Sequence, residues 1–71
     1  MILEHRKTLR GKYEIELVTE SDGSVSIVQW TNGRLTAKAV GYDRESGYVR
    51  FVNTIQMAKV IDGINYRRVE G

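Results

Sequence analysis

The chain has 71 residues, of which 41% are hydrophobic and 28% are charged, and its formal net charge is +2. A chain of this size forms one domain with a small core, and this composition excludes bulk disorder. It has no cysteine and one histidine, His5, which excludes a disulfide scaffold, a cysteine nucleophile, cysteine-ligated zinc and sites built on pairs of histidines. We therefore expect residues 1–71 to form one small β-rich domain that is not an enzyme and holds no cofactor or metal.

The charge is distributed unevenly along the chain. Residues 1–12 hold four basic side chains and one acidic one, residues 13–24 hold four acidic side chains and no basic one, and the remainder holds seven basic and four acidic ones. This mild basic excess favours a polyanionic partner. No apolar run approaches the roughly 18 residues of a membrane span, and the first residues lack the apolar stretch of a secretory signal. We expect a cytoplasmic protein without membrane contact.

In chain order, the first ten residues predict either a strand or a flexible basic arm that carries Arg6, Lys7 and Arg10. Alternation of apolar and polar side chains then predicts strands over residues 12–19, 25–30 and 35–42. Turn-forming residues separate them, and the Asn32-Gly33 pair is typical of a tight hairpin because both residues tolerate positive φ angles. The pattern is that of an antiparallel meander.

The second half of the chain is less regular. Alternation predicts a fourth strand over residues 48–52, after turn residues at 43–47. Residues 54–61 favour a short helix that ends before Gly63, although a strand over 58–61 that pairs through the following turn is an alternative. A last strand is predicted over residues 64–69.

This order of four hairpin-linked strands, a helical turn and a final strand resembles the order of SH3-like barrels. The resemblance is one of topology and implies no functional residue. We therefore predict a mainly β fold, in which a small antiparallel meander of five to six strands forms a partly open SH3-like barrel with one short helix near residues 54–61. The alternative is an α+β fold, an open antiparallel sheet with a helix on one face, as in some dimeric single-strand-binding proteins.

The predicted strands have two apolar faces. One is the main core, with Tyr13, Ile15, Leu17, Val25, Ile27, Leu35, Ala37, Ala39, Val49 and Phe51. The second would be polar if it only met water, but it carries Val28, Trp30, Val40, Tyr42, Tyr48 and Val52, with Lys38 and Arg50 among them. It is therefore either a second small core within a curled sheet or a contact surface.

As a contact surface, the second face predicts nucleic-acid binding. The rings of Trp30, Tyr42 and Tyr48 would stack on unpaired bases, while Lys38 and Arg50 would contact phosphates. Additional charge would come from Arg6, Lys7, Arg10, Arg67 and Arg68. Two carboxylates on the same face, those of Glu14 and Glu16, oppose this hypothesis because they repel phosphate.

The sequence is also compatible with two other functions. The same face could serve a protein–protein interaction or homodimerisation, which would add buried area to a thin core. A more remote alternative is an accessory subunit of an enzyme complex.

Overall fold

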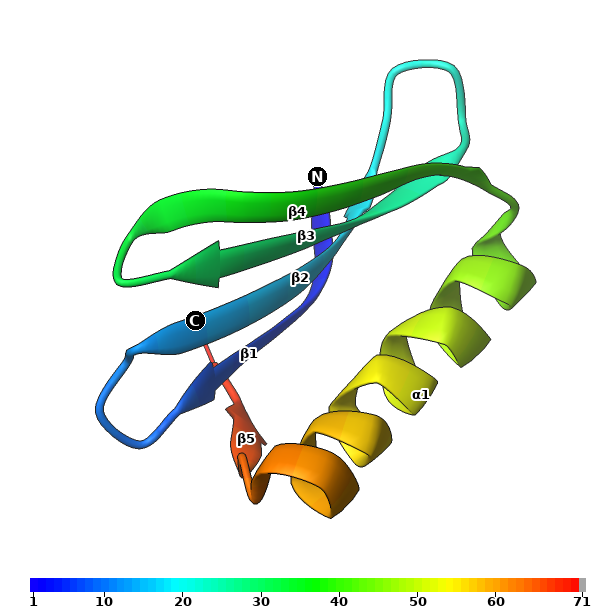
Figure 1. Cartoon of the computed structure of the whole chain (residues 1–71). Helices are drawn as coiled ribbons and strands as arrows, with labels where there is room; N and C mark the ends of the chain where they lie inside the picture. The colour runs from blue at the N-terminus through cyan, green and yellow to red at the C-terminus, as the bar shows by residue number, and fades with distance from the viewer. Residues whose placement is uncertain (71) are drawn as a thin grey trace.

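A computed structural model describes residues 1–70 as one antiparallel sheet with a helix packed against it (Figure 1). The sheet order is β4-β3-β2-β1-β5. The elements in chain order are β1 (Ile2–Thr8), β2 (Tyr13–Thr19), β3 (Val25–Thr31), β4 (Arg34–Tyr42), α1 (Arg44–Asp62) and β5 (Tyr66–Arg68).

The predicted mainly β meander is confirmed, with five strands and one helix within the described residues. The sheet does not close into a barrel, because β4 and β5 remain as its two edges. The helix lies on one side, in contact with β2, β3 and β4 (Figure 1). This arrangement is the one described by the α+β alternative. We call the side of the sheet against α1 the helix face and the other side the open face.

The hairpin predicted at Asn32-Gly33 joins β3 to β4. Asn32 has φ 53° and Gly33 has φ 77°, as a two-residue hairpin turn with two left-handed residues requires. Ile2–Thr8 forms β1, which pairs with β2 from Ile2↔Val18 to Lys7↔Glu14. The alternative of a flexible arm is therefore wrong for these residues, because their backbone is held in the sheet.

The strand predicted over residues 48–52 is wrong, since these residues belong to α1. The helix begins after Asp43, whose carboxylate accepts a hydrogen bond from the backbone N–H of Ser46 at 2.8 Å. Gly63 ends it in the left-handed conformation and donates its N–H to the Lys59 carbonyl at 3.1 Å. Both are standard capping arrangements. The helix predicted near 54–61 is the second half of this longer element.

The core lies between the helix face and α1. Its buried members are four aliphatic residues of β2 and β3 together with Phe51 of α1: Ile15, Leu17, Val25 and Ile27. Leu3, Tyr42, Ile55 and Tyr66 pack around this cluster. Four other residues predicted in the core, namely Leu35, Ala37, Ala39 and Val49, are exposed. Ala37 and Ala39 lie on β4, at the edge of the sheet, and Val49 lies on α1 itself.

Two irregularities in β4 change which face its side chains occupy. Gln29 pairs with Ala37 and Trp30 pairs with Leu35, so β4 holds one extra residue there. A second extra residue lies between the Ile27↔Ala39 and Val25↔Tyr42 pairs. Each such bulge inverts the alternation beyond it. Leu35 therefore lies on the open face, and Tyr42 lies on the helix face.

Candidate nucleic-acid interface

The structure divides the five residues that the sequence placed on one binding face. Trp30 and Lys38 do lie on the open face, where they pair with Glu14 and Val28 of neighbouring strands. The other three do not, and their predicted placement is wrong. The bulge in β4 turns Tyr42 toward the core, and the helical conformation of residues 44–62 places Tyr48 and Arg50 on α1.

Those three residues also separate from one another. Tyr42 and Arg50 line a groove of about 330 Å³ between the end of β4 and the start of α1. Tyr48 lines a different groove of about 510 Å³ with Leu3 and Leu17. The continuous stacking platform of three aromatic rings is therefore not assembled in this fold.

One row of directly paired residues crosses the whole open face. It runs through all five strands in the order Arg67, Lys7, Glu14, Trp30 and Leu35. The row is basic on β5 and β1, acidic on β2, and aromatic or apolar on β3 and β4. Any ligand that lies along it meets cations first, a carboxylate next and an indole ring last.

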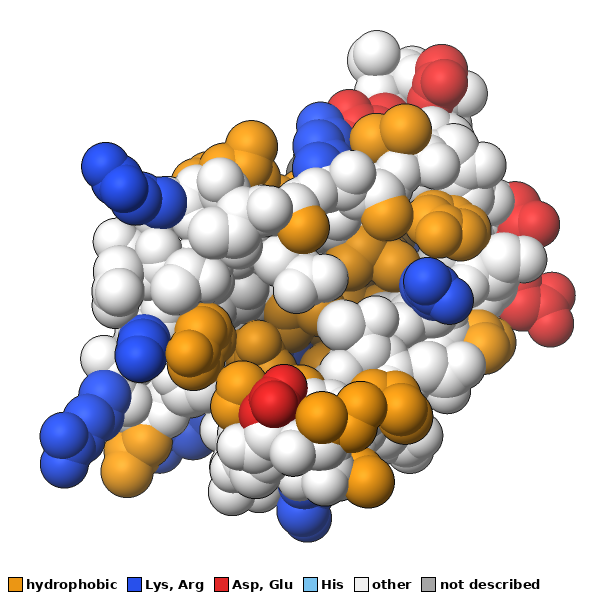
Figure 2. All heavy atoms as spheres, viewed as in Figure 1, with side chains coloured by type: hydrophobic (Ala, Val, Ile, Leu, Met, Phe, Trp, Pro, Cys, Tyr) orange, Lys and Arg blue, Asp and Glu red, His pale blue; other side chains and the backbone are white. Residues whose placement is uncertain are grey.

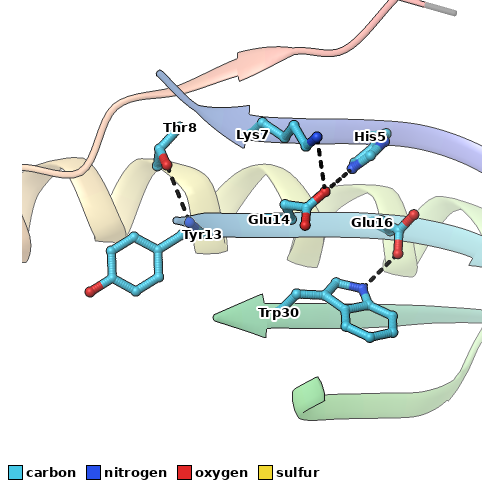
Figure 3. Close-up of polar contacts among 7 residues, drawn as sticks. All are labelled: His5, Lys7, Thr8, Tyr13, Glu14, Glu16 and Trp30. Atoms are coloured by element: carbon cyan, nitrogen blue, oxygen red, sulfur yellow. Dashed lines mark hydrogen bonds and ion pairs between the residues drawn. The ribbon is translucent and has the colours of Figure 1, made fainter. Parts of the chain in front are cut away.

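The carboxylates at the centre of the open face are held by their neighbours. Glu14 Oε1 lies 3.0 Å from His5 Nε2 and 3.6 Å from Lys7 Nζ, and Glu16 Oε1 accepts a 2.6 Å hydrogen bond from Trp30 Nε1 (Figure 3). The predicted position of both glutamates on the same face as Trp30 is thus confirmed. The bond to Glu16 fixes the orientation of the indole, which is partly buried.

Outside this row, other side chains of the open face are already engaged by contacts within the chain. Lys38 Nζ lies 3.2 Å from Glu20 Oε1, so its charge is already paired. Val28 is only 7% exposed. Val40 and Tyr48, which the sequence placed on the same face, are more than half exposed, so the second small core offered as one alternative is not assembled from these residues.

The strongest positive charge lies where the two ends of the chain meet. β5 pairs with β1 so that Lys7 lies directly opposite Arg67, and Arg6 lies directly opposite Arg68. Like charges in directly opposed cross-strand positions destabilise a sheet. Glu4 offsets the second pair, since its Oε1 lies 3.0 Å from Arg6 Nε and 3.5 Å from Arg68 Nε.

The repulsion between Lys7 and Arg67 is less well offset by neighbouring carboxylates. Lys7 reaches Glu14 at 3.6 Å, and Arg67 takes part in no ion pair within residues 1–70. The turn between β1 and β2 adds the exposed side chains of Arg10 and Lys12. We call Lys7, Arg10, Lys12 and Arg67 the basic edge.

A groove of about 410 Å³ runs between this turn and β5, and Lys7, Arg67 and Arg68 are among its lining residues. Figure 2 shows Lys and Arg side chains gathered at the end of the molecule that holds this turn, whereas acidic side chains gather at the opposite end. The charge of the molecule is thus polarised along its length. The basic end is the part of the surface best suited to an anionic ligand.

The sequence identified most members of the basic edge as supplementary charge but gave no reason to place them together. Arg67 and Arg68 were expected to point to opposite faces of a strand, and their partners agree with this, since Arg67 pairs with Lys7 and Arg68 reaches Glu4. The missing information was the pairing of β5 with β1. No local pattern signals it, because the two strands lie at opposite ends of the chain.

No family model matches this chain, and no similar chain was found among curated proteins or solved structures. In residues 1–70, no helix is long and apolar enough to span a membrane, and no group of three or more His, Asp or Glu side chains is arranged to hold a metal ion. The function therefore has to be inferred from the charges and geometry of the chain itself.

Proposed function

We propose that the protein is a non-enzymatic module that binds single-stranded nucleic acid through the basic edge. The observation that supports this most strongly is the direct opposition of Lys7 and Arg67 on the open face. Two cations held side by side repel each other, and a phosphate between them replaces this repulsion with attraction. Arg67 has no competing carboxylate within the described residues, so its guanidinium is available for a phosphate oxygen.

The row across the open face favours a single strand over a duplex. Neighbouring strands lie roughly 5 Å apart, so Trp30 lies about 10 Å from Lys7 across the sheet. A base attached to a phosphate at Lys7 can reach this distance only if it is unpaired and turned toward the sheet. It would then meet Glu14, whose carboxylate accepts hydrogen bonds from exocyclic amino groups, and the indole of Trp30.

Phosphate contacts give this proposal a measurable signature. Each contact to a single strand lowers the slope of log affinity against log salt by about 0.7, so four basic side chains give a slope of up to about −3. The measurement is fluorescence anisotropy of an end-labelled single-stranded oligonucleotide, titrated with the protein from about 20 mM to 300 mM salt. The emission of Trp30, the only tryptophan, reports in the same titration whether a base reaches the open face.

Paired variants separate the basic edge from the net charge. Arg10→Gln with Arg67→Gln should reduce the magnitude of the slope by about 1.4 and weaken binding at low salt. Arg44→Gln with Arg50→Gln removes the same charge from α1 and should leave the slope unchanged. No binding at about 20 mM salt would refute the proposal, and so would equal weakening by the two double variants.

A further inference from the structure

The outer surface of α1, turned away from the sheet, carries an uncharged row with a valine at each end and two amide side chains between them. Gly47 and Phe51 are buried against the sheet. On the opposite side of the helix, spacings of four, three and four residues place Val49, Asn53, Gln56 and Val60 in one line. Val49 is 53% exposed and Val60 is 79% exposed.

A helix that has apolar residues on two opposite sides is normally covered on both. Only the inner side of α1 is covered within the described residues. Met57 and Ile61, beside the row, are also more than half exposed, and hydrophobic side chains are visible on the outside of the helix in Figure 2. A helix whose outer side met only water would normally carry charged side chains in this line.

We infer that a second copy of this chain covers the outer face of α1, with the two helices antiparallel about a two-fold axis. The row reads Val, Asn, Gln, Val and is therefore nearly the same from both ends. In an antiparallel pair, Val49 packs against Val60 of the partner subunit, and Asn53 lies opposite Gln56 of the partner subunit. Apolar contacts form at the two ends, and amide groups that can hydrogen-bond each other meet in the middle.

The charges beside the row support the same arrangement. Glu45, Val52 and Lys59 recur every seven residues, so they lie on one flank of the row. Within residues 1–70 neither Glu45 nor Lys59 takes part in an ion pair. Antiparallel packing brings Glu45 to within about 7 Å, measured along the helix, of Lys59 of the partner subunit, which long side chains can bridge.

The expected dimer is a weak one. One pair of helices of this length, about 28 Å each, lies at the low end of the size range of specific interfaces. Self-association should therefore be visible by sedimentation velocity between roughly 5 and 500 µM protein, without nucleic acid. The dimer does not depend on the basic edge, and neither inference rests on the other.

Variants on the outer face test the dimer. Val60→Glu should raise the dissociation constant at least about tenfold, because it buries an unpaired charge opposite Val49 of the partner subunit. Val60 is so exposed in one copy that the far-UV circular dichroism of this variant should stay unchanged. Val40→Glu is the matched control, since Val40 is 65% exposed on β4, and it should leave the dissociation constant unchanged.

A charge exchange tests the antiparallel pairing. Lys59→Glu should weaken the dimer, and adding Glu45→Lys to it should restore the dimer, because the exchanged pair again carries opposite charges. A monomer at every concentration would overturn the inference. It would also be overturned if Val40→Glu dissociated the dimer and Val60→Glu did not, or if the charge exchange failed to restore what Lys59→Glu had lost.

Discussion

Replacing Gly47 by alanine tests how closely α1 packs on the sheet. In an exposed helix, Gly→Ala stabilises by about 1 kcal/mol, because alanine loses less backbone freedom on folding. At Gly47 the added Cβ would overlap Cγ2 of Val25 and would lie 3.3 Å from Cβ of Tyr42. The sign of the effect therefore depends on whether these neighbours can move.

Val25 has little room to move. It is 1% exposed, and its β-branched side chain is restricted at χ1. Overpacking of this kind costs about 1–3 kcal/mol, and an overlap with a confined side chain belongs in the upper part of that range. After the gain in helix propensity is subtracted, Gly47→Ala should lower the free energy of unfolding by about 1–2 kcal/mol. The melting temperature should fall by about 4–16 °C.

The assay is urea unfolding followed by far-UV circular dichroism, at a protein concentration low enough to keep the chain monomeric. Val25→Ala serves as the second background, since it removes the overlapping methyl groups. Gly47→Ala should be neutral or stabilising by up to about 1 kcal/mol in that background, which gives a coupling energy of about 2 kcal/mol. If Gly47→Ala stabilised the unmodified chain by about 1 kcal/mol, the close contact between α1 and β3 would be refuted.

Three further predictions concern the core, the helix cap and a partly buried phenol. Phe51 has no exposed surface, so Phe51→Ala should cost about 3–5 kcal/mol in urea unfolding, and a loss below about 1 kcal/mol would contradict its central place in the core. Hydrogen bonds from the backbone N–H and then the hydroxyl of Ser46 lower the pKa of Asp43. These hydrogen bonds therefore stabilise the fold at pH values above the ordinary aspartate pKa, and the stabilisation is lost as pH falls through the lowered pKa of Asp43. Asp43→Ala should lower the melting temperature at pH 7 and flatten its fall in acid, and an unchanged acid profile would exclude the cap as the cause. Burial, and secondarily the charge of Tyr13, raises the pKa of Tyr66. Stability should therefore fall as pH rises above the ordinary tyrosine pKa of 10.0, and Tyr66→Phe should remove the last step of the tyrosine absorbance titration. A last step that persists in this variant would assign it to another tyrosine.

The sequence by itself determined the hairpin-linked strands and the centre of the core. The two-residue period of a strand predicts that Ile15 and Leu17 of β2 share one face with Val25 and Ile27 of β3, and all four are buried. The Asn32-Gly33 turn joins β3 to β4 and sets the register with which these two strands begin to pair. These features depend on neighbours within a few residues of each other, so local patterns carry the necessary information.

Tertiary packing decided the conformation of residues 48–52. Their side chains alternate as in a strand, and a glycine just before them disfavours a helix by about 1 kcal/mol. Packing reverses this preference, because Gly47 lets the backbone of α1 approach Val25 and because the helix brings Phe51 into the core. The same glycine that indicates a turn in the sequence is a contact point in the fold.

Tertiary structure also decided which side chains make up each surface. The two bulges of β4 move Leu35 and Tyr42 to faces opposite those that alternation predicts. Only the second bulge is marked in the sequence, by Gly41, whose φ of 85° is typical of a glycine at a bulge. The basic edge exists because β5 returns to pair with β1, which places Arg67 beside Lys7 although they are sixty positions apart. Charges that far apart in the chain are brought together by sheet topology, a property of the whole fold and not of any segment.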